Sequence, residues 1–229
     1  MLKIDGDVIL IDKPYTWTSF QVVKKLKYLI CKHYGIKKLK IGHAGTLDPL
    51  ATGLLIVCIG RYTKKIEEFQ TTAKEYTGTF VLGATTASYD REKPIDRTYP
   101  YEHITDEQIY EAAKALSGEQ NQVPPSFSAV KVDGKRAYKY ARAEQDVVIE
   151  AKPITIYEFE ITKIDLPKVN FRIVCSKGTY IRAIARDFGL KLCSGAYLSA
   201  LCRTKSGDLS VENAITIDEF EASLSATPV

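Results

Sequence analysis

The chain has 229 residues, of which 45% are hydrophobic and 26% charged, and its formal net charge is +4 at pH 7. This length allows one sizeable core, or at most one core and a small lobe, so we expect a single domain. No run approaches the roughly 18 apolar residues of a membrane span, and the first residues lack a secretory pattern; we therefore expect a cytoplasmic protein.

In chain order, residues 7–12 are typical of a buried strand, which Pro14 ends because proline cannot donate to a sheet. A helix is expected next. Thr18 and Gln21 have the spacing of a capping box. The apolar residues expected on one face of this helix are Phe20, Val23, Leu26 and Ile30, and its other face is basic.

Residues 54–59 form a short branched run between two glycines, as in a central strand. Residues 75–82 alternate and predict a strand, and residues 106–116 predict a helix. Two prolines within residues 122–126 predict an extended loop, since each disfavours helix at the residue before it.

From Gly134 to Arg142 the spacing again predicts a helix, and residues 147–162 are β-rich but broken at Pro153. The strict alternation at Val169, Phe171, Ile173 and Cys175 predicts a strand with one buried face. Residues 180–192 predict a helix that buries Ile181, Ile184, Ala185 and Phe188. A last short helix should begin at Thr216, where Glu219 completes a second capping box. The whole order indicates an α+β domain with a mixed sheet.

The charge is distributed unevenly. Five acidic residues follow Lys205, so residues 1–205 carry 32 basic against 23 acidic side chains. No acid lies between Lys13 and Asp48, a stretch that holds Lys24, Lys25, Lys27, Lys32, Lys37, Lys38 and Lys40. Such a patch suits a polyanion, although a solvated basic helix would have the same composition.

The cysteines and histidines give no sign of a disulfide framework or a metal site. The five cysteines are Cys31, Cys58, Cys175, Cys193 and Cys202, without any C-x-x-C pair. We interpret them as reduced core residues. None of the three histidines has zinc-ligand spacing with a cysteine or carboxylate, so we expect no catalytic metal.

A loop rich in glycine, residues 42–54 (GHAGTLDPLATGL), feeds the apolar strand at 54–59 and contains one carboxylate, Asp48. Pro49 fixes the backbone beside it, while Leu47 and Leu50 make its surroundings partly apolar. On its own an Asp-Pro pair usually marks only a turn.

The loop as a whole resembles the catalytic motif of the TruB-type tRNA pseudouridine synthases, in which Asp48 matches the nucleophilic aspartate. Further matching blocks span nearly the entire chain in the family's order. They are Lys13-Pro14 with Thr18-Ser19, residues 74–78 (KEYTG), 123–125 (VPP) with 128–131 (SAVK), 134–138 (GKRAY) with Ala141-Arg142, 175–182 (CSKGTYIR), and 195–198 (GAYL) with Leu201.

The resemblance implies the pseudouridine synthase fold, with a mostly antiparallel central sheet flanked by helices and an active-site cleft across it. It also implies isomerisation of the T-loop uridine at tRNA position 55 by base flipping, without a cofactor. The implied catalytic residues are Asp48, Tyr76 and Arg182. By the same resemblance Arg182 keeps Asp48 ionised and Tyr76 lies against the uracil, since an arginine nearby lowers an aspartate pKa and stacking offsets the cost of flipping.

Further residues follow from the resemblance or from charge. Tyr180 and Leu201 match positions that line the family's pocket, and His43 matches a residue that contacts RNA near the flipped base. Phosphate contacts are expected from the basic helix and from Lys64, Lys131, Arg136 and Arg142. The expected partner is the T-arm of tRNA, bound by a monomer.

Many bacterial members of the family carry a small RNA-binding domain after the catalytic one. Here we expect residues 1–229 to form one catalytic domain with an acidic end at 206–229 and no such extra domain. Two other functions are open at this point. One is an RNA-binding or RNA-folding protein with secondary or lost catalysis; the other is a glycosidase, although these usually use a carboxylate pair and the motif holds one acid.

Overall fold

The longest buried run of the sequence forms strand β3 (Ala51–Gly60) in a computed structural model that describes residues 2–143 and 145–226. Every residue from Gly53 to Ile59 in this strand is buried, because both of its faces are covered. By its contacts the chain divides into two compact units, which we call unit 1 (Met1–Tyr76 and Leu201–Val229) and unit 2 (Thr77–Ala200).

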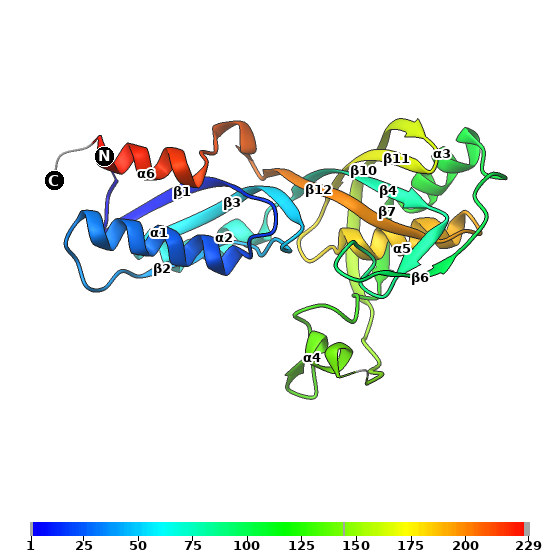
Figure 1. Cartoon of the computed structure of the whole chain (residues 1–229), viewed down its shortest axis with the longest axis horizontal. Helices are drawn as coiled ribbons and strands as arrows, with labels where there is room; N and C mark the ends of the chain where they lie inside the picture. Colours follow the sequence, from blue (N-terminus) through cyan, green and yellow to red (C-terminus); the bar gives the residue numbers. More distant parts are fainter. Residues whose placement is uncertain (1, 144, 227–229) are drawn as a thin grey trace. The chain divides into compact units, whose positions relative to one another are not determined.

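The main sheet is mixed and has the strand order β1-β3-β12-β4-β11-β10-β7, with β2 paired to β3 and β13 paired to β12 (Figure 1). Strands β3 and β12 run parallel, whereas the other registered pairs are antiparallel. This arrangement confirms the α+β class and the mostly antiparallel sheet. Strands β4 and β12 each begin in one unit and end in the other.

The elements have the following bounds: β1 Gly6–Lys13, α1 Ser19–His33, β2 Ile41–His43, β3 Ala51–Gly60, η1 Arg61–Lys65, α2 Ile66–Thr71, β4 Lys74–Leu82, β5 Ala84–Thr86, β6 Ile95–Thr98, α3 Asp106–Ala115, β7 Gly118–Gln122, β8 Lys131–Val132, β9 Lys135–Arg136, α4 Ala137–Arg142, β10 Lys152–Asp165, β11 Lys168–Cys175, α5 Ile181–Lys191, β12 Ala196–Ser206, β13 Leu209–Ser210, η2 Val211–Asn213 and α6 Ile217–Ser225.

In unit 1, helices α1 and α6 cover one face of β1 and β3, where Ile11, Leu26 and Phe220 share a buried cluster (Figure 1). The opposite face of β3 packs against η1 and α2 through Ile56 and its neighbours. The capping boxes at Thr18 and Thr216 are both present, which confirms the predicted starts of α1 and α6.

In unit 2, the core is aromatic. Phe80 of β4 stacks on Phe171 of β11 with ring centroids 4.1 Å apart, and Phe188 of α5 packs against Phe80. All four predicted core residues of α5 are buried, and β11 alternates as expected. Helix α5 comes so close to β12 that a Cβ on Gly189 would lie 2.4 Å from the Ala196 nitrogen.

The structure corrects three expectations of secondary structure. Phe20 is 71% exposed, because it lies about 120° around α1 from the centre of the buried face. Helix α4 starts at Ala137 and not at Gly134, since Asp133 and Gly134 both adopt positive φ and turn the short hairpin β8–β9. Strand β10 continues through Pro153. Pro153 pairs with β7, whereas the pairing of β10 with β11 starts at Ile156. The sheet therefore tolerates the N–H that proline lacks.

Two further findings concern a strand that was not expected and the burial of the cysteines. Strand β12 was not anticipated from the sequence, although it pairs with the catalytic-motif strand β3. All five cysteines are free. Cys58 and Cys175 are buried as expected, Cys31 and Cys202 are half-buried, and the core assignment is wrong for Cys193, which is exposed. No helix within residues 2–143 and 145–226 is long and apolar enough to cross a membrane.

Candidate active site

Asp48 lies in the loop that connects β2 to β3, and its side chain is half-buried. Gly45, three residues earlier, has φ +95°, a conformation that side chains with a Cβ rarely adopt. The Ala51 N–H donates a hydrogen bond to the Asp48 carbonyl at 3.1 Å. The loop therefore makes a tight turn around the carboxylate before it enters the buried strand.

The N-terminal side of unit 1 holds this loop through two buried side chains. The Ser19 hydroxyl accepts from the Leu47 N–H at 2.9 Å and lies 3.1 Å from the Leu47 carbonyl, to which it donates. The Lys13 ammonium is fully buried and donates to the carbonyls of Pro14 at 2.9 Å and Pro49 at 3.3 Å. Asp48 is thus flanked by two residues whose backbone is fixed.

Lys13 also influences the site electrostatically. Burial lowers the pKa of Lys13 from 10.5 to about 8, while the negative charges of Asp48 and Asp12 act in the opposite direction. Near neutral pH the ammonium therefore remains mostly protonated. The buried ammonium therefore places a positive charge close enough to Asp48 for the two to interact electrostatically.

Arg203 of β12 holds the other end of the loop from within the core. Its side chain is buried, and it donates from Nε to the Leu54 carbonyl at 2.8 Å and from Nη2 to the Gly45 carbonyl at 3.1 Å. One guanidinium therefore ties together residues that flank Asp48 on both sides. No motif or spacing in the sequence singles out this arginine.

The parallel pairing of β12 with β3 requires a glycine at position 53. Gly53 has φ +96°, and a Cβ there would lie 2.4 Å from the Arg203 carbonyl oxygen. The Gly53 N–H donates to the Asp12 carboxylate at 3.1 Å. Together with Ser19, Lys13 and Arg203, this contact fixes the Asp48 loop without any help from a substrate, so the carboxylate is positioned in advance.

Three other predicted site residues belong to unit 1. His43 ends β2 and is half-buried; burial, and then the charge of Arg203, lower its pKa, so its imidazole is neutral at pH 7. Leu201 pairs in register with Ala51, three residues after Asp48. Tyr76 is half-buried in β4. The structure therefore brings His43, Asp48 and Leu201 to neighbouring positions around β3.

Arg182 and Tyr180 lie in unit 2 at the start of α5. Arg182 is 4% exposed, which excludes the surface role that a helix arginine usually has. Its Nε lies 3.7 Å from Asp90 Oδ2, and its two terminal nitrogens donate to the carbonyls of Ser88 at 3.2 Å and Phe127 at 3.0 Å. The guanidinium is therefore held in one orientation.

Asp90 is a buried carboxylate that the sequence analysis missed. Its Oδ1 accepts hydrogen bonds from the Ser88 hydroxyl at 2.5 Å and from the Glu92 N–H at 2.9 Å. No local pattern marks it, because its partner Arg182 is 92 residues away in the sequence. Because Asp90 contacts and helps to orient the guanidinium of Arg182, it joins the candidate site.

Tyr180 is the N-cap residue of α5 and is half-buried. The amide of Gln122, at the end of β7, bonds to both backbone groups of Tyr180: Oε1 accepts from its N–H at 2.8 Å, and Nε2 donates to its carbonyl at 3.2 Å. The position of Tyr180 is therefore fixed by a buried amide rather than by a helix cap of its own.

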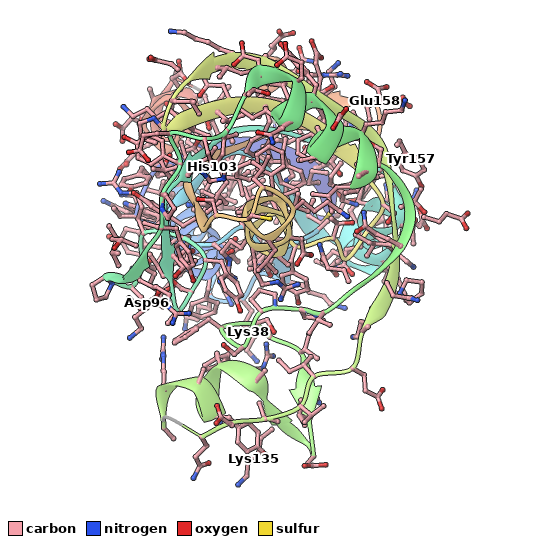
Figure 2. All side chains as sticks on the ribbon, turned by 90° about the vertical axis from the view of Figure 1, so that its right-hand side faces the viewer. Lys38, Asp96, His103, Lys135, Tyr157 and Glu158 are labelled. Atoms are coloured by element: carbon pink, nitrogen blue, oxygen red, sulfur yellow. The ribbon has the colours of Figure 1, made fainter. Side chains whose placement is uncertain are left out.

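The four phosphate-binding residues predicted outside the basic helix are all exposed. Lys64 lies in η1 of unit 1, whereas Lys131, Arg136 and Arg142 lie between residues 123 and 151 of unit 2, which we call the projecting segment. In this segment the Arg142 guanidinium lies 5.3 Å from the Tyr138 ring. Figure 2 shows Lys135 of the same segment, which extends away from the packed part of unit 2.

Comparison with known proteins assigns the family. Residues 32–181 match the model of the TruB family pseudouridylate synthase N-terminal domain, which is more than half of the chain and includes Asp48. The chain belongs to the TruB family. It is therefore a pseudouridine synthase, an isomerase that converts uridine to pseudouridine in RNA.

Curated relatives agree along nearly the whole chain. A protein of Flavobacterium johnsoniae named tRNA pseudouridine synthase B is 59% identical over 222 residues, which cover 96% of this chain and 97% of the relative. Proteins with the same name from Phocaeicola vulgatus and Bacteroides fragilis are 55% and 53% identical, with 94% of this chain covered in each case. These alignments include every candidate residue between positions 43 and 203.

Solved structures support the fold. This chain superposes with a TM-score of 0.72 and 29% identity on one chain of a crystal structure of a Cbf5–Nop10–Gar1 complex, covering 96% of this chain and 54% of that one. Superposition on one chain of a structure of an H/ACA RNP bound to a substrate RNA containing 2'-deoxyuridine gives a TM-score of 0.66 and 26% identity, covering 95% of this chain and 53% of that one. The chain thus spans about half the length of these larger chains, and the pseudouridine synthase fold is confirmed.

Proposed function

We propose that this protein converts the uridine at position 55, in the T-loop of tRNA, to pseudouridine, with Asp48 as its nucleophile. The relatives named tRNA pseudouridine synthase B support the choice of substrate. The choice of nucleophile rests on one observation: Asp48 lies in a loop that Ser19, Lys13 and Arg203 hold from three directions.

The reaction breaks the bond between the ribose and the base nitrogen, turns the uracil, and rejoins it through carbon. Neither a redox change nor net hydrolysis occurs, so the step needs a nucleophile and a dry pocket and no redox cofactor. Asp48 attacks either the ribose or the base, and it must be ionised to do so. Lys13 supplies a nearby positive charge within unit 1.

We further propose that Arg182 pairs with Asp48 during the reaction. A guanidinium is the opposite charge that a carboxylate needs when substrate displaces the water around it, and a charge-assisted contact is stronger than a neutral hydrogen bond. The contacts of Arg182 with Asp90, Ser88 and Phe127 support this role, because they orient the guanidinium before substrate arrives.

The target nucleotide must leave its stack to reach Asp48, at a cost of a few kcal/mol. We propose that Tyr76 stacks on the uracil, which returns roughly 1 to 3 kcal/mol, and that Tyr180 and Leu201 line the pocket. His43 would contact the RNA beside the flipped base as a neutral imidazole, since its pKa is lowered. This role needs no proton transfer from His43.

The remaining parts of the proposal concern the partner and the setting. Lys64, Lys131, Arg136 and Arg142 are exposed cations that would contact phosphates of the T-arm. Units 1 and 2 would act as one catalytic domain in a monomeric cytoplasmic protein without a metal. Among the described histidine, cysteine and carboxylate side chains, no group of three or more is arranged to hold a metal ion.

The test is to map pseudouridine in unmodified tRNA after incubation with wild-type and Asp48→Asn protein. We expect pseudouridine at position 55 with the wild type and none with the variant, while the affinity for tRNA stays within a few fold because asparagine has nearly the shape of aspartate. Modification by the variant would contradict the role of Asp48, and modification at another site would contradict the substrate. A folding role without catalysis would leave tRNA refolding unchanged in the variant and give no pseudouridine with either protein.

A further inference from the structure

The outer face of helix α1 combines exposed aromatic and basic side chains. Phe20 is 71% exposed and Tyr28 is 59% exposed, and the exposed Lys24 and Lys27 lie between them. With 3.6 residues per turn, these four side chains fall within about 100° of the helix circumference. We call this surface the basic-aromatic face.

The charge of this face is not neutralised by its own surroundings. Residues 14–47 contain seven lysines and no acid, whereas a segment of this length in this chain would on average hold about four acids. Lys25 forms an ion pair with Glu221 of α6, with its nitrogen 3.1 Å from the carboxylate. The other six lysines are exposed, and within the described part of the chain no ion pair is found for Lys24 or Lys27.

The basic-aromatic face begins at the catalytic loop. Ser19, next to Phe20, holds Leu47 through two hydrogen bonds, so the first turn of α1 lies against the residue before Asp48. Tyr15 is 47% exposed, and the adjacent Thr16 N–H donates to the Pro49 carbonyl at 2.9 Å. From Phe20 to Lys32 the helix extends about 18 Å away from the loop (Figure 1).

We propose that the basic-aromatic face binds the RNA strand that adjoins the target uridine, with Lys24 and Lys27 on its phosphates and Phe20 and Tyr28 stacked on unpaired bases. This proposal rests on the proposed function, since it needs a flipped uridine at Asp48. Alternation of aromatic rings with lysines suits single-stranded RNA, whose bases stack on aromatic rings while its backbone needs cations. A protein partner would call for a contiguous apolar patch instead, and the lysines interrupt one here.

The first experiment compares Lys24→Ala/Lys27→Ala with a matched control, Lys114→Ala/Lys191→Ala, which removes two exposed lysines from unit 2. The dissociation constant for an unmodified T-arm hairpin is measured between 50 and about 200 mM salt. If both α1 lysines contact phosphates, the logarithmic salt slope falls by about 1.4 to 1.8 relative to wild type, and KM rises while kcat at saturating RNA is unchanged. The control retains the wild-type slope.

The second experiment tests stacking. Phe20→Leu and Tyr28→Leu keep an apolar side chain but lose the ring, and each is expected to weaken hairpin binding at least about fivefold. Phe20→Tyr and Tyr28→Phe keep the ring and should restore wild-type affinity. Thermal unfolding of every variant is expected to match the wild type, because all four side chains are exposed.

The outcomes separate this inference from the proposed function. If the wild type forms pseudouridine and the α1 variants bind the hairpin like the control, the inference is wrong and the function stands. Weaker binding of whole tRNA with unchanged binding of the hairpin would also overturn it, since the face would then contact a distant part of the RNA. If the wild type forms no pseudouridine, the proposed function itself fails.

Discussion

The Asp48 loop and the projecting segment differ in how firmly the protein holds them. Buried side chains from β1, α1 and β12 bond to the backbone of the Asp48 loop. In the projecting segment, the strands β8 and β9 have two residues each, and Ala137 is the buried residue of α4. The first region is fixed before RNA binds, and the second presents Lys131, Arg136 and Arg142 on two-residue strands and a six-residue helix.

This difference fits the separate roles proposed for the two regions. A nucleophile must be held within a fraction of an ångström of its productive position, so its loop needs buried supports. A phosphate contact tolerates more motion, because the attraction is long-ranged and does not depend on one orientation. Damage to the loop supports should therefore reduce kcat, whereas damage to the projecting segment should raise KM.

The largest effect is expected from Arg203→Met. Loss of the guanidinium leaves the carbonyls of Gly45 and Leu54 without their donors, so the loop that carries Asp48 loosens at both ends. We expect kcat to fall about 100-fold and the free energy of unfolding to fall by about 2 to 5 kcal/mol. Single-turnover kinetics and urea unfolding measure the two quantities. A less stable variant with wild-type kcat would show that Arg203 has no part in positioning Asp48.

A smaller effect on catalysis is expected from the triple variant Lys131→Ala/Arg136→Ala/Arg142→Ala. All three side chains are exposed, so unfolding should be unchanged, while KM for tRNA rises and kcat is retained. The salt slope of binding should fall by about 2 to 3, from the loss of three phosphate contacts. A loss of kcat with unaltered KM would contradict the division between the two regions.

The pH dependence of stability tests the buried ammonium of Lys13. Its pKa is about 8 in the folded protein and 10.5 in an unfolded chain, so the unfolded state binds the extra proton between these values. The free energy of unfolding should therefore gain up to roughly 1.4 kcal/mol per pH unit as pH rises from 8 towards 10.5. Below pH 8 Lys13 is protonated in both states, so its titration adds nothing to the free energy of unfolding there. Urea titrations of wild type and Lys13→Met at pH 7.5 and 9.5 isolate the effect of Lys13. If the two proteins differ in free energy of unfolding by the same amount at both pH values, the pKa of Lys13 is not lowered.

The smallest effect is expected from Thr216→Ala, which serves as a control for general destabilisation. It removes the N-cap of α6 and the partner of Glu219, at a cost of about 1 kcal/mol. Helix α6 packs in the same unit as the Asp48 loop but does not bond to it, so kcat at 25 °C should equal that of the wild type. Reduced kcat here would mean that any loss of stability in unit 1 impairs catalysis.

Local sequence patterns predicted much of the fold. The capping boxes at Thr18 and Thr216, the buried run of β3 and the alternation of β11 are determined by residues a few positions apart, and all are confirmed. Phe20 was misplaced because its spacing fits the apolar stripe while the buried face of α1 lies elsewhere.

The supports of the site were not predictable in the same way. Asp48 stands out through its motif, but Asp90 and Arg203 act through partners that are distant in the sequence. Their residue types and neighbours are ordinary, and their burial depends on tertiary packing. Propensity and spacing carry no information about such pairs, so the structure was needed to find them.

The bond between Arg203 and Leu54 joins residues 149 positions apart. A ribosome that adds roughly 5 to 20 residues per second needs about 7 to 30 seconds to translate this stretch. During that interval the nascent chain contains Asp48 but not the guanidinium that fixes its loop. Asp48 is therefore made early, and its loop gains its last support only when synthesis is nearly over.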